Sequence, residues 1–312
     1  MHSPVVLGLD FGGTKIAVAV CDLSGTRLGE TTIETLAEQG ARASLERGIL
    51  AAKTLLDDVA PGRELAAVGA ATFGIPGNDG IALAPAIPGW SELALGRELG
   101  GAFIGAEIRL ATDVKAAAQA EAEWGALVGC DPGIYLNLGT GLAVAVVSAG
   151  SVLSGAHGAA GEIGYNLRSI GDVGQVLAQR TPLEDVVSGS GFLRSASRLM
   201  PEASTAAEIY AKAAEDPRIG RLIREFVDEL AFHLVNLVIA INPIRVAVGG
   251  GMVRSWQHLE ASLRRALDAA VPYPPELVLA SFPFDAPLVG ALALGTVAAR
   301  ARQARGAPEL AC

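Results

Sequence analysis

Two glycine-rich turns that contain threonine have the composition of phosphate-binding turns. The first, Asp10-Phe11-Gly12-Gly13-Thr14-Lys15, stands between two apolar runs typical of β-strands. Glycine lets the backbone turn tightly and approach a ligand closely, and consecutive N–H groups in such a turn bind anions. Thr14 adds a hydroxyl donor and Lys15 a positive charge, while Asp10 at the strand end can hold Mg²⁺ through water. By itself, the segment is equally typical of a plain hairpin turn.

A second turn of similar composition, Asn137-Leu138-Gly139-Thr140-Gly141, also lies between two strand-like runs. The repeated strand–turn–strand unit indicates two similar lobes that face each other across a cleft. A third cluster, Gly249-Gly250-Gly251, follows a buried strand, where an adenosine ring would lie against the backbone; a simple strand-to-helix turn is the alternative. None of the three fits G-x-x-x-x-G-K-[ST] or the dinucleotide pattern G-x-G-x-x-G, which argues against both of those enzyme classes.

The elements that position these turns can be predicted from hydrophobic periodicity. A 3.6-residue period predicts a helix over 45–56, and we expect further helices over the alanine-rich 113–127 and from about 287 to 302. The chain after Glu184 is expected to be mainly helical. Strands are expected over 5–10, 16–21, 26–33, 65–72, 108–111, 133–138, 142–147 and 245–248.

Composition narrows the class of protein. The 312 residues, 51% of them hydrophobic, suit two domains of about 150 residues with buried cores. A net charge of −9 without a long Lys/Arg cluster argues against a nucleic-acid partner. The scattered cysteines Cys21, Cys130 and Cys312 fit a reducing compartment. The start lacks a signal-peptide pattern and no apolar stretch suits a bilayer, so we expect a cytoplasmic protein without a membrane partner.

Seven short motifs are spaced over nearly the whole chain. They are LDFGGTK at 9–15, GIPG at 74–77, PAIPGW at 85–90, TDVKAAAQAE at 112–121, LGTG at 138–141, AGEIGY at 160–165 and VGGGM at 248–252. Together they resemble the ROK family of the sugar kinase, Hsp70 and actin superfamily. The resemblance implies a two-lobed actin-like ATPase (ribonuclease H-like) α/β fold, each lobe a mixed sheet flanked by helices. It places residues 1–112 and about 289–312 in a small N-terminal lobe and 113–288 in a large C-terminal lobe.

The resemblance also implies an activity: ATP-dependent transfer of the γ-phosphate, with Mg²⁺, to the 6-hydroxyl of a glucose-like hexose. Asp113 matches the family's catalytic aspartate, which accepts the proton of the attacking hydroxyl; aspartate is also a favoured helix N-cap, and the two roles are compatible. Glu162 and Glu184 match sugar ligands, since a carboxylate accepts two hydroxyl hydrogen bonds at fixed angles. Gly77 and Thr112 are expected beside the sugar, and homodimers are common in the family.

ATP is expected between the two Gly-Thr turns, with adenosine near Gly249 and Gly250. The chain departs from the family at its structural zinc, whose ligands are one histidine and three cysteines. The corresponding positions here hold Tyr165, Gln175, Leu177 and Pro182. Since none of these is a usual zinc ligand, we expect no zinc site.

The sugar pocket departs as well. The family histidine also contacts sugar, so Tyr165 changes that wall, while Thr112 and Ala86 each stand where the family has asparagine. Three carboxylates with fewer amides suit a sugar that carries an ammonium group. Within the family this favours kanosamine (3-amino-3-deoxy-D-glucose), the substrate of a 6-kinase in ansamycin antibiotic biosynthesis.

Other functions stay open. A glucokinase, or another hexose or N-acyl-hexosamine kinase, would change only the substrate. A non-catalytic sugar-sensing regulator is a second alternative, against which Asp113 and both turns argue. The family's DNA-binding repressors carry a helix-turn-helix domain before the first turn, and here we expect no room for one before Asp10.

Overall fold

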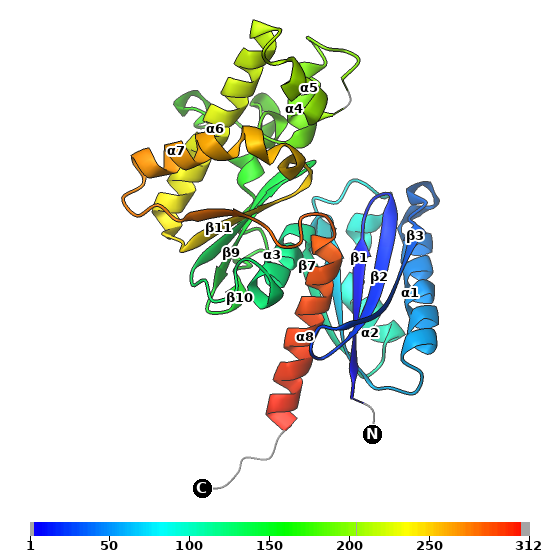
Figure 1. Cartoon of the computed structure of the whole chain (residues 1–312). Coiled ribbons are helices and arrows are strands. Elements are labelled where there is room, and N and C mark those ends of the chain that lie inside the picture. The colour runs from blue at the N-terminus through cyan, green and yellow to red at the C-terminus, as the bar shows by residue number, and fades with distance from the viewer. Residues whose placement is uncertain (1–2, 204, 307–312) are drawn as a thin grey trace, which may run out of the picture. The chain divides into compact units, whose positions relative to one another are not determined.

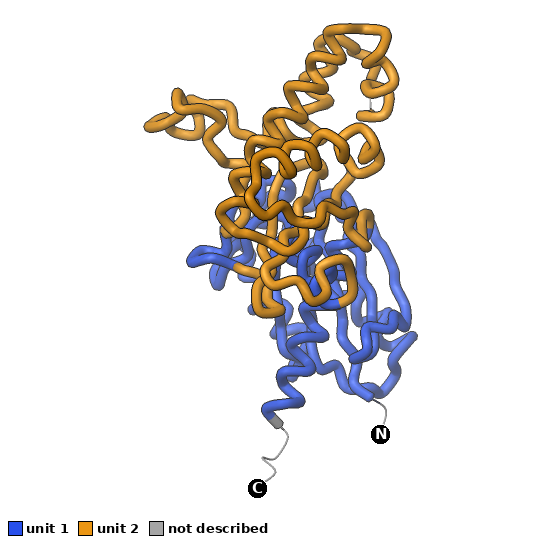
Figure 2. Tube along the Cα trace, turned by 60° about the vertical axis from the view of Figure 1, so that its left-hand side comes forward, with its two compact units in different colours: residues 1–123, 154–159, 285–312 blue, residues 124–153, 160–284 orange. Residues whose placement is uncertain are grey.

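The computed structural model describes residues 3–203 and 205–306, which fall into two units (Figures 1 and 2). The first unit comprises residues 1–123, 154–159 and 285–312, and the second comprises 124–153 and 160–284. The lobe boundaries expected at residues 112 and 289 stay a prediction. Residues 307–312, Cys312 included, lie outside the described part.

The sheet of the first unit has the strand order β3-β2-β1-β4-β7. The neighbouring strands β3, β2 and β1 pair antiparallel, whereas β4 and β7 run parallel to β1. The apolar runs of the sequence form the central strands, which are almost completely buried. The strands are β1 (Val5–Phe11), β2 (Lys15–Asp22), β3 (Arg27–Glu34), β4 (Leu65–Thr72) and β7 (Glu107–Thr112); β5 (Ile75–Pro76) and β6 (Ile81–Ala82) form a small hairpin.

Helices cover both faces of this sheet, with α1 and α8 on opposite sides (Figure 1). Leu45 of α1 packs into the core with Phe11 and Ile16, and α8 packs closely on β1 and β4. A Cβ at Gly69 of β4 would lie 1.8 Å from the carbonyl oxygen of Ala291, so glycine is required for this close approach. The helices are α1 (Gly40–Val59), α2 (Leu95–Ala102), α3 (Asp113–Trp124) and α8 (Ala286–Gly306).

The sheet of the second unit, in the order β10-β9-β8-β11-β12, repeats the arrangement of the first. An antiparallel set forms one side, and two strands parallel to the central β8 form the other. The internal repeat predicted from the two turns is therefore present in the strand order. The strands are β8 (Gly133–Leu138), β9 (Leu142–Ser148), β10 (Ser151–Val152), β11 (Arg245–Gly249) and β12 (Glu276–Leu279).

Four helices bury one face of the second sheet. Phe192 and Phe226 meet with ring centroids 4.9 Å apart, and their cluster includes apolar side chains of β8, β9 and β11. The helices are α4 (Gly189–Ala196), α5 (Ala206–Lys212), α6 (Pro217–Ile241) and α7 (Glu260–Ala270). Short 3₁₀ helices carry much of the remaining chain, among them η3 (Ile163–Tyr165), η4 (Ile170–Asp172), η5 (Leu177–Gln179), η6 (Leu183–Asp185) and η7 (Gly251–His258).

Candidate functional site

The first glycine turn joins β1 to β2 in the first unit. The N–H of Gly12 donates to the carbonyl of Lys15 (3.0 Å), and the hydroxyl of Thr35 donates to the carbonyl of Gly12 (2.7 Å). Gly13 and Thr14 donate their backbone N–H groups to no other atom of the described residues. Two successive unpaired N–H groups in a tight turn form an anion-binding concavity.

Two carboxylates of the first unit, Asp10 and Asp113, lie close enough to repel each other. Asp10 is the half-buried penultimate residue of β1, and Asp113 begins α3 directly after β7. Burial, and then the nearby charge of Asp113, raise the pKa of Asp10 to about 7, and the charge of Lys15 opposes this shift. A half-buried carboxylate that lacks sufficient positive charge suits a divalent cation, which Mg²⁺ sites supply with one or two carboxylates plus phosphate and water.

Thr112, not Asp113, caps the N-terminus of α3. The hydroxyl oxygen of Thr112 accepts the N–H of Lys115 (3.2 Å), and this threonine is 5% exposed. Asp113 is the first helical residue, and its Oδ1 accepts the N–H of Val114 (2.8 Å). The carboxylate is thus held at a helix N-terminus, where the helix dipole favours its ionised form.

The PAIPGW motif is anchored next to the first turn by its tryptophan. The Trp90 ring is fully buried, with its centroid 5.4 Å from that of Phe11 and 5.5 Å from that of Phe73. Its indole N–H donates to the hydroxyl of Thr72 (2.9 Å). A Cβ at Gly13 would lie 3.4 Å from that of Ala86, so this segment borders the turn.

Gly77, expected beside the sugar, closes the turn of the β5–β6 hairpin. Its N–H donates to the carbonyl of Gly80 (2.8 Å). It belongs to the first unit together with Thr112 and Asp113, whereas Glu162, Tyr165 and Glu184 belong to the second.

The second glycine turn repeats the construction of the first. The N–H of Gly139 donates to the carbonyl of Gly141 (3.1 Å), and within the described part of the chain Thr140 and Gly141 make no hydrogen bond with their own N–H groups. Helix α4 begins beside this turn, because Gly189 donates its N–H to Gly139 (2.7 Å) and the Ser190 hydroxyl donates to the Thr140 carbonyl (2.6 Å). Each unit therefore carries one glycine turn in which two successive N–H groups bond to no other described residue.

A cavity of about 430 Å³ adjoins the second turn within the second unit. Gly251 lines it, whereas Gly249 and Gly250 are not among its lining residues. Gly250 (φ +89°) turns the chain from β11 into η7 against the backbone of Leu138. Gly249-Gly250-Gly251 therefore forms the strand-to-helix turn given as the alternative, and its last residue also lines the cavity in which adenosine is expected. The lining residues are Gly139, Thr140, Gly189, Ser190, Leu193, Thr205, Ala206, Ala207, Gly251, Met252, Arg254 and Ser255.

Several of these cavity residues were not predicted from the sequence. The capping box between Thr205 and Glu208 marks the start of α5, and the pattern T-x-x-E is the signal that could have located it. Arg254, whose guanidinium carbon lies 4.9 Å from the ring centroid of Phe284, belongs to no motif. It reaches the cavity only because β11 continues into η7.

The three sugar-binding residues expected in the second unit come together. The N–H of Leu142 donates to Oε2 of Glu184 (2.9 Å), directly after the second turn. Burial, and then the charges of Glu184 and Glu162, raise the pKa of the Tyr165 hydroxyl. Tyr165 therefore shares one environment with both carboxylates and is 39% exposed.

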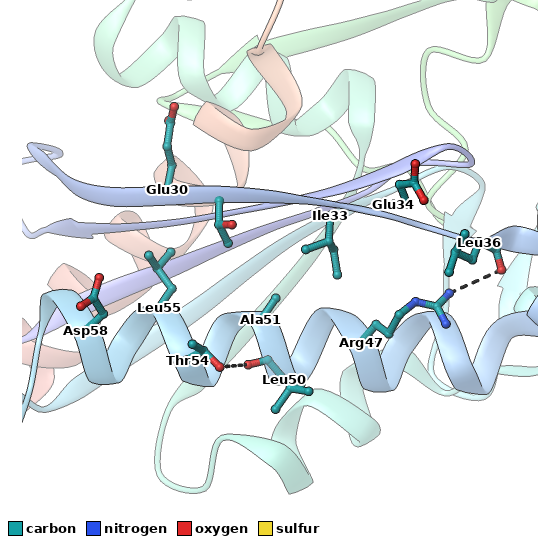
Figure 3. A pocket seen from close by; sticks show the side chains of 11 residues that line it. Glu30, Ile33, Glu34, Leu36, Arg47, Leu50, Ala51, Thr54, Leu55 and Asp58 are labelled. Carbon is teal, nitrogen blue, oxygen red and sulfur yellow. Dashed lines mark hydrogen bonds between the residues drawn. The ribbon is translucent and has the colours of Figure 1, made fainter.

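A further cavity, of about 870 Å³, lies between β3 and α1 and contains none of the predicted site residues (Figure 3). Arg47 donates to the carbonyl of Leu36 at one end of this groove, and Ile33 and Leu55 contribute apolar walls (Figure 3). The groove is separate from the turn residues.

Among the described residues, no three His, Cys, Asp or Glu side chains group in a way that could hold a metal ion. None of the described helices has the length and hydropathy needed to cross a bilayer.

Comparison with known proteins gives a consistent result. Residues 6–297 match the ROK family. A glucokinase of Thermotoga maritima is 30% identical over 288 residues, covering 86% of this chain and 88% of its own. A kanosamine kinase of Amycolatopsis mediterranei is 31% identical over 313 residues, covering 95% and 100%. The crystal structure of a ROK hexokinase from Thermus thermophilus superimposes with a TM-score of 0.79 at 29% identity, covering 97% and 100%.

Proposed function

The chain belongs to the ROK family and has the actin-like ATPase fold of its sugar kinases, and from this premise we propose how it phosphorylates a hexose. We propose transfer of the γ-phosphate of ATP to the 6-hydroxyl of a glucose-like sugar. The observation that carries this proposal is the pair of glycine turns, one per unit, each with two successive unpaired N–H groups among the described residues. Such turns suit the oligophosphate of a nucleotide.

The first unit supplies the groups for proton transfer and charge neutralisation. Asp113 is proposed to accept the proton of the attacking hydroxyl, because it lies at a helix N-terminus, where the helix dipole favours negative charge. Asp10 would hold Mg²⁺ through water, and Lys15 would face the phosphates. Bound Mg²⁺ supplies positive charge to the phosphate oxygens, which lowers the barrier to phosphoryl transfer.

The second unit is proposed to hold the rest of the nucleotide and the sugar. Thr140 and Gly141 would bind phosphate, and the adjoining cavity of about 430 Å³ has room for an adenosine. Glu162 and Glu184 would accept hydrogen bonds from sugar hydroxyls, with Tyr165 as a further wall.

For the specific sugar we propose an amino sugar of the kanosamine type. The three residues assigned to the sugar, Glu162 and Glu184 of the second unit and Asp113 of the first, are all carboxylates, and a relative at 31% identity is a kanosamine kinase. Glucose is the competing substrate, since a relative at 30% identity is a glucokinase. We further propose that the protein acts in the cytoplasm. We also propose that it is a homodimer, and analytical ultracentrifugation would test this oligomeric state.

The experiment is a measurement of ADP release with kanosamine, glucose, glucosamine, N-acetylglucosamine and N-acetylmannosamine as acceptors. We expect the highest kcat/KM for kanosamine; a clear preference for glucose would overturn the amino-sugar proposal while leaving the kinase intact. Absence of turnover with every sugar would favour a non-catalytic sugar sensor. Asp113→Asn should lower kcat by about 10²–10⁴-fold while leaving the sugar Kd within about threefold of the wild type.

A further inference from the structure

We propose that Arg180 is a positioning residue that holds the sugar-binding side chains of the second unit in place. It does so by closing loop 166–182, the segment between η3 and η6. The guanidinium donates from Nη2 to the carbonyl of Tyr165 (2.6 Å) and from Nη1 to the carbonyl of Asn166 (3.1 Å). A planar guanidinium suits this task, because its donors are fixed in a fork. The inference rests on the proposed function, since it concerns the same sugar site.

The two ends of loop 166–182 carry the proposed sugar ligands. Glu162 and Tyr165 stand at and within η3 before the loop, and Glu184 stands in η6 after it. The two short helices are packed together: a Cβ at Gly164 would lie 3.1 Å from the Cβ of Glu184. A contact that ties the end of the loop back to η3 therefore adds a second link between Tyr165 and Glu184, beside this direct packing.

The first half of the loop has its own attachment to α6. Arg168 forms a two-pronged ion pair with Glu229, and the amide of Asn166 lies 3.4 Å from Nδ1 of the buried His233. The carboxylate of Asp172 accepts the N–H groups of Arg168 and Ser169 at 2.8 and 2.9 Å. This half is held without Arg180.

The second half reaches η3 through Arg180. Gln175 bonds it to Gly171 (2.7 Å) and Asp172 (3.1 Å) of the first half. Among the hydrogen bonds of the described residues, only those of the Arg180 side chain join residues 174–182 to residues 163–170. Apolar packing does not replace them, because Val173 and Val176 are 68% and 61% exposed and Ile170 is 92% exposed. The backbone N–H bonds to Asp172, aided by the charges of Arg180 and Arg168, hold the pKa of that carboxyl below its usual range. The guanidinium of Arg180 is therefore attracted by the carboxylate of Asp172, in addition to its hydrogen bonds with two carbonyls.

The loop is where the family resemblance implies a structural zinc. The matching positions here are Tyr165, Gln175, Leu177 and Pro182, which offer neither a thiolate nor an imidazole. The residues present do not fit the metal. The guanidinium of Arg180 joins the same two parts of the chain that a metal would join, since it reaches back to residue 165.

Loss of Arg180 should weaken sugar binding more than nucleotide binding. The two carbonyls would then be hydrogen-bonded by water, and Tyr165 and Glu184 would lose one of the two links that hold them together. The cavity beside the second turn contains no residue of loop 166–182. We expect Arg180→Ala to raise the KM for the sugar by about tenfold or more, the size expected for losing charge-assisted hydrogen bonds. The KM for ATP should stay within about twofold, and kcat at saturating sugar within about threefold.

Three measurements separate positioning from general structure. Arg180→Lys keeps the charge but not the fork, so its sugar KM should lie between those of wild type and Arg180→Ala. Added guanidinium ion should lower the sugar KM of Arg180→Ala alone. The matched control, Arg218→Ala, removes an exposed ion pair with Asp216 in the same unit and should leave every constant unchanged.

A readout without activity comes from the phenol of Tyr165. Burial and the charges of Glu184 and Glu162 raise the pKa of this phenol. If the Tyr165 side chain moves away from the two carboxylates in Arg180→Ala, its pKa should fall toward the ordinary value. An ultraviolet titration of wild type and Arg180→Ala measures this change, with Tyr165→Phe identifying the signal. Wild-type enzyme that phosphorylates no sugar would sink the proposed function. If the wild type is active, and both Arg180 variants keep its KM for the sugar and its Tyr165 titration, the positioning role is overturned.

Discussion

Glu184 and Leu142 are joined by a hydrogen bond of 2.9 Å, from the backbone N–H that follows the second glycine turn to Oε2 of the carboxylate. A Cβ at Gly141 would lie 2.5 Å from the same oxygen. The carboxylate expected to bind sugar therefore also supports the turn expected to bind phosphate. Sugar binding and nucleotide binding meet at this one side chain.

This double contact predicts different results for two substitutions. Glu184→Gln keeps an oxygen acceptor for Leu142 and should raise only the KM for the sugar. Glu184→Ala leaves the N–H without that partner, and should raise the KM for both the sugar and ATP by about tenfold, the scale of one lost hydrogen bond. Steady-state kinetics with each substrate varied would measure both. Equal effects of the two variants on the KM for ATP would contradict the shared support.

Asp10 predicts a pH dependence of stability in the absence of nucleotide. Its folded-state pKa of about 7 lies above the ordinary value of 3.8, so the folded protein binds more protons than the unfolded chain between these values. Stability should therefore fall as pH rises from about 4 to 7. Asp10→Asn removes this loss, and should raise the free energy of unfolding at pH 8 by at least about 1 kcal/mol, but not at pH 4.

Denaturant unfolding at the two pH values would measure the effect of Asp10→Asn. The control is Asp79→Asn, because the Asp79 side chain is 89% exposed and its loss should change stability little at either pH. A variant at Asp10 that is no more stable than wild type at pH 8 would show that burial and Asp113 do not strain this carboxylate.

Trp90 predicts a link between the stability of the first unit and nucleotide binding. Trp90→Ala should lower the free energy of unfolding by about 3–5 kcal/mol, as expected for truncating a fully buried aromatic side chain. Trp90→Phe should cost less, because it loses mainly the hydrogen bond to Thr72. Both should raise the KM for ATP, since Phe11 packs on this ring and begins the first turn. A destabilised variant with an unchanged KM for ATP would refute that link.

The cavity beside the second turn predicts selective loss of nucleotide affinity. Ala207 lines it and is exposed, so a tryptophan there would fill space without disturbing the core. Ala207→Trp should weaken binding of an ATP analogue by about tenfold or more, with the sugar Kd unchanged. The matched control is Ala211→Trp, also exposed on α5 but outside the cavity lining. Calorimetric titration that gives the same nucleotide affinity for both variants would place adenosine elsewhere.

The sequence predicted the elements best where burial decides the conformation. The strands expected over 5–10 and 133–138 are observed at Val5–Phe11 and Gly133–Leu138, because continuous apolar runs next to glycine leave little choice. The short β12 (Glu276–Leu279) was not predicted, since pairing with β11 rather than its own pattern makes it a strand. The helix expected over 113–127 ends at Trp124.

Motifs identified the candidate site residues, but not the groups that hold them. Both glycine turns followed from residue types and spacing, whereas the grouping of Tyr165 with two glutamates followed from the family resemblance. The N-cap alternative for Asp113 was wrong, because Thr112 precedes the helix and accepts the N–H of Lys115, whereas Asp113 is the first helical residue and accepts the N–H of Val114. Arg180 could not be predicted, since its contacts with residues 165 and 166 depend on how an irregular loop closes.

The central claim is transfer of phosphate from ATP to a sugar hydroxyl, and ³¹P nuclear magnetic resonance of the reaction mixture tests it most directly. With kanosamine or glucose as acceptor, we predict a hexose 6-phosphate signal that grows in step with ADP, and no such signal with Asp113→Asn. ADP and inorganic phosphate without any sugar phosphate, or equal sugar phosphate from Asp113→Asn, would contradict the account.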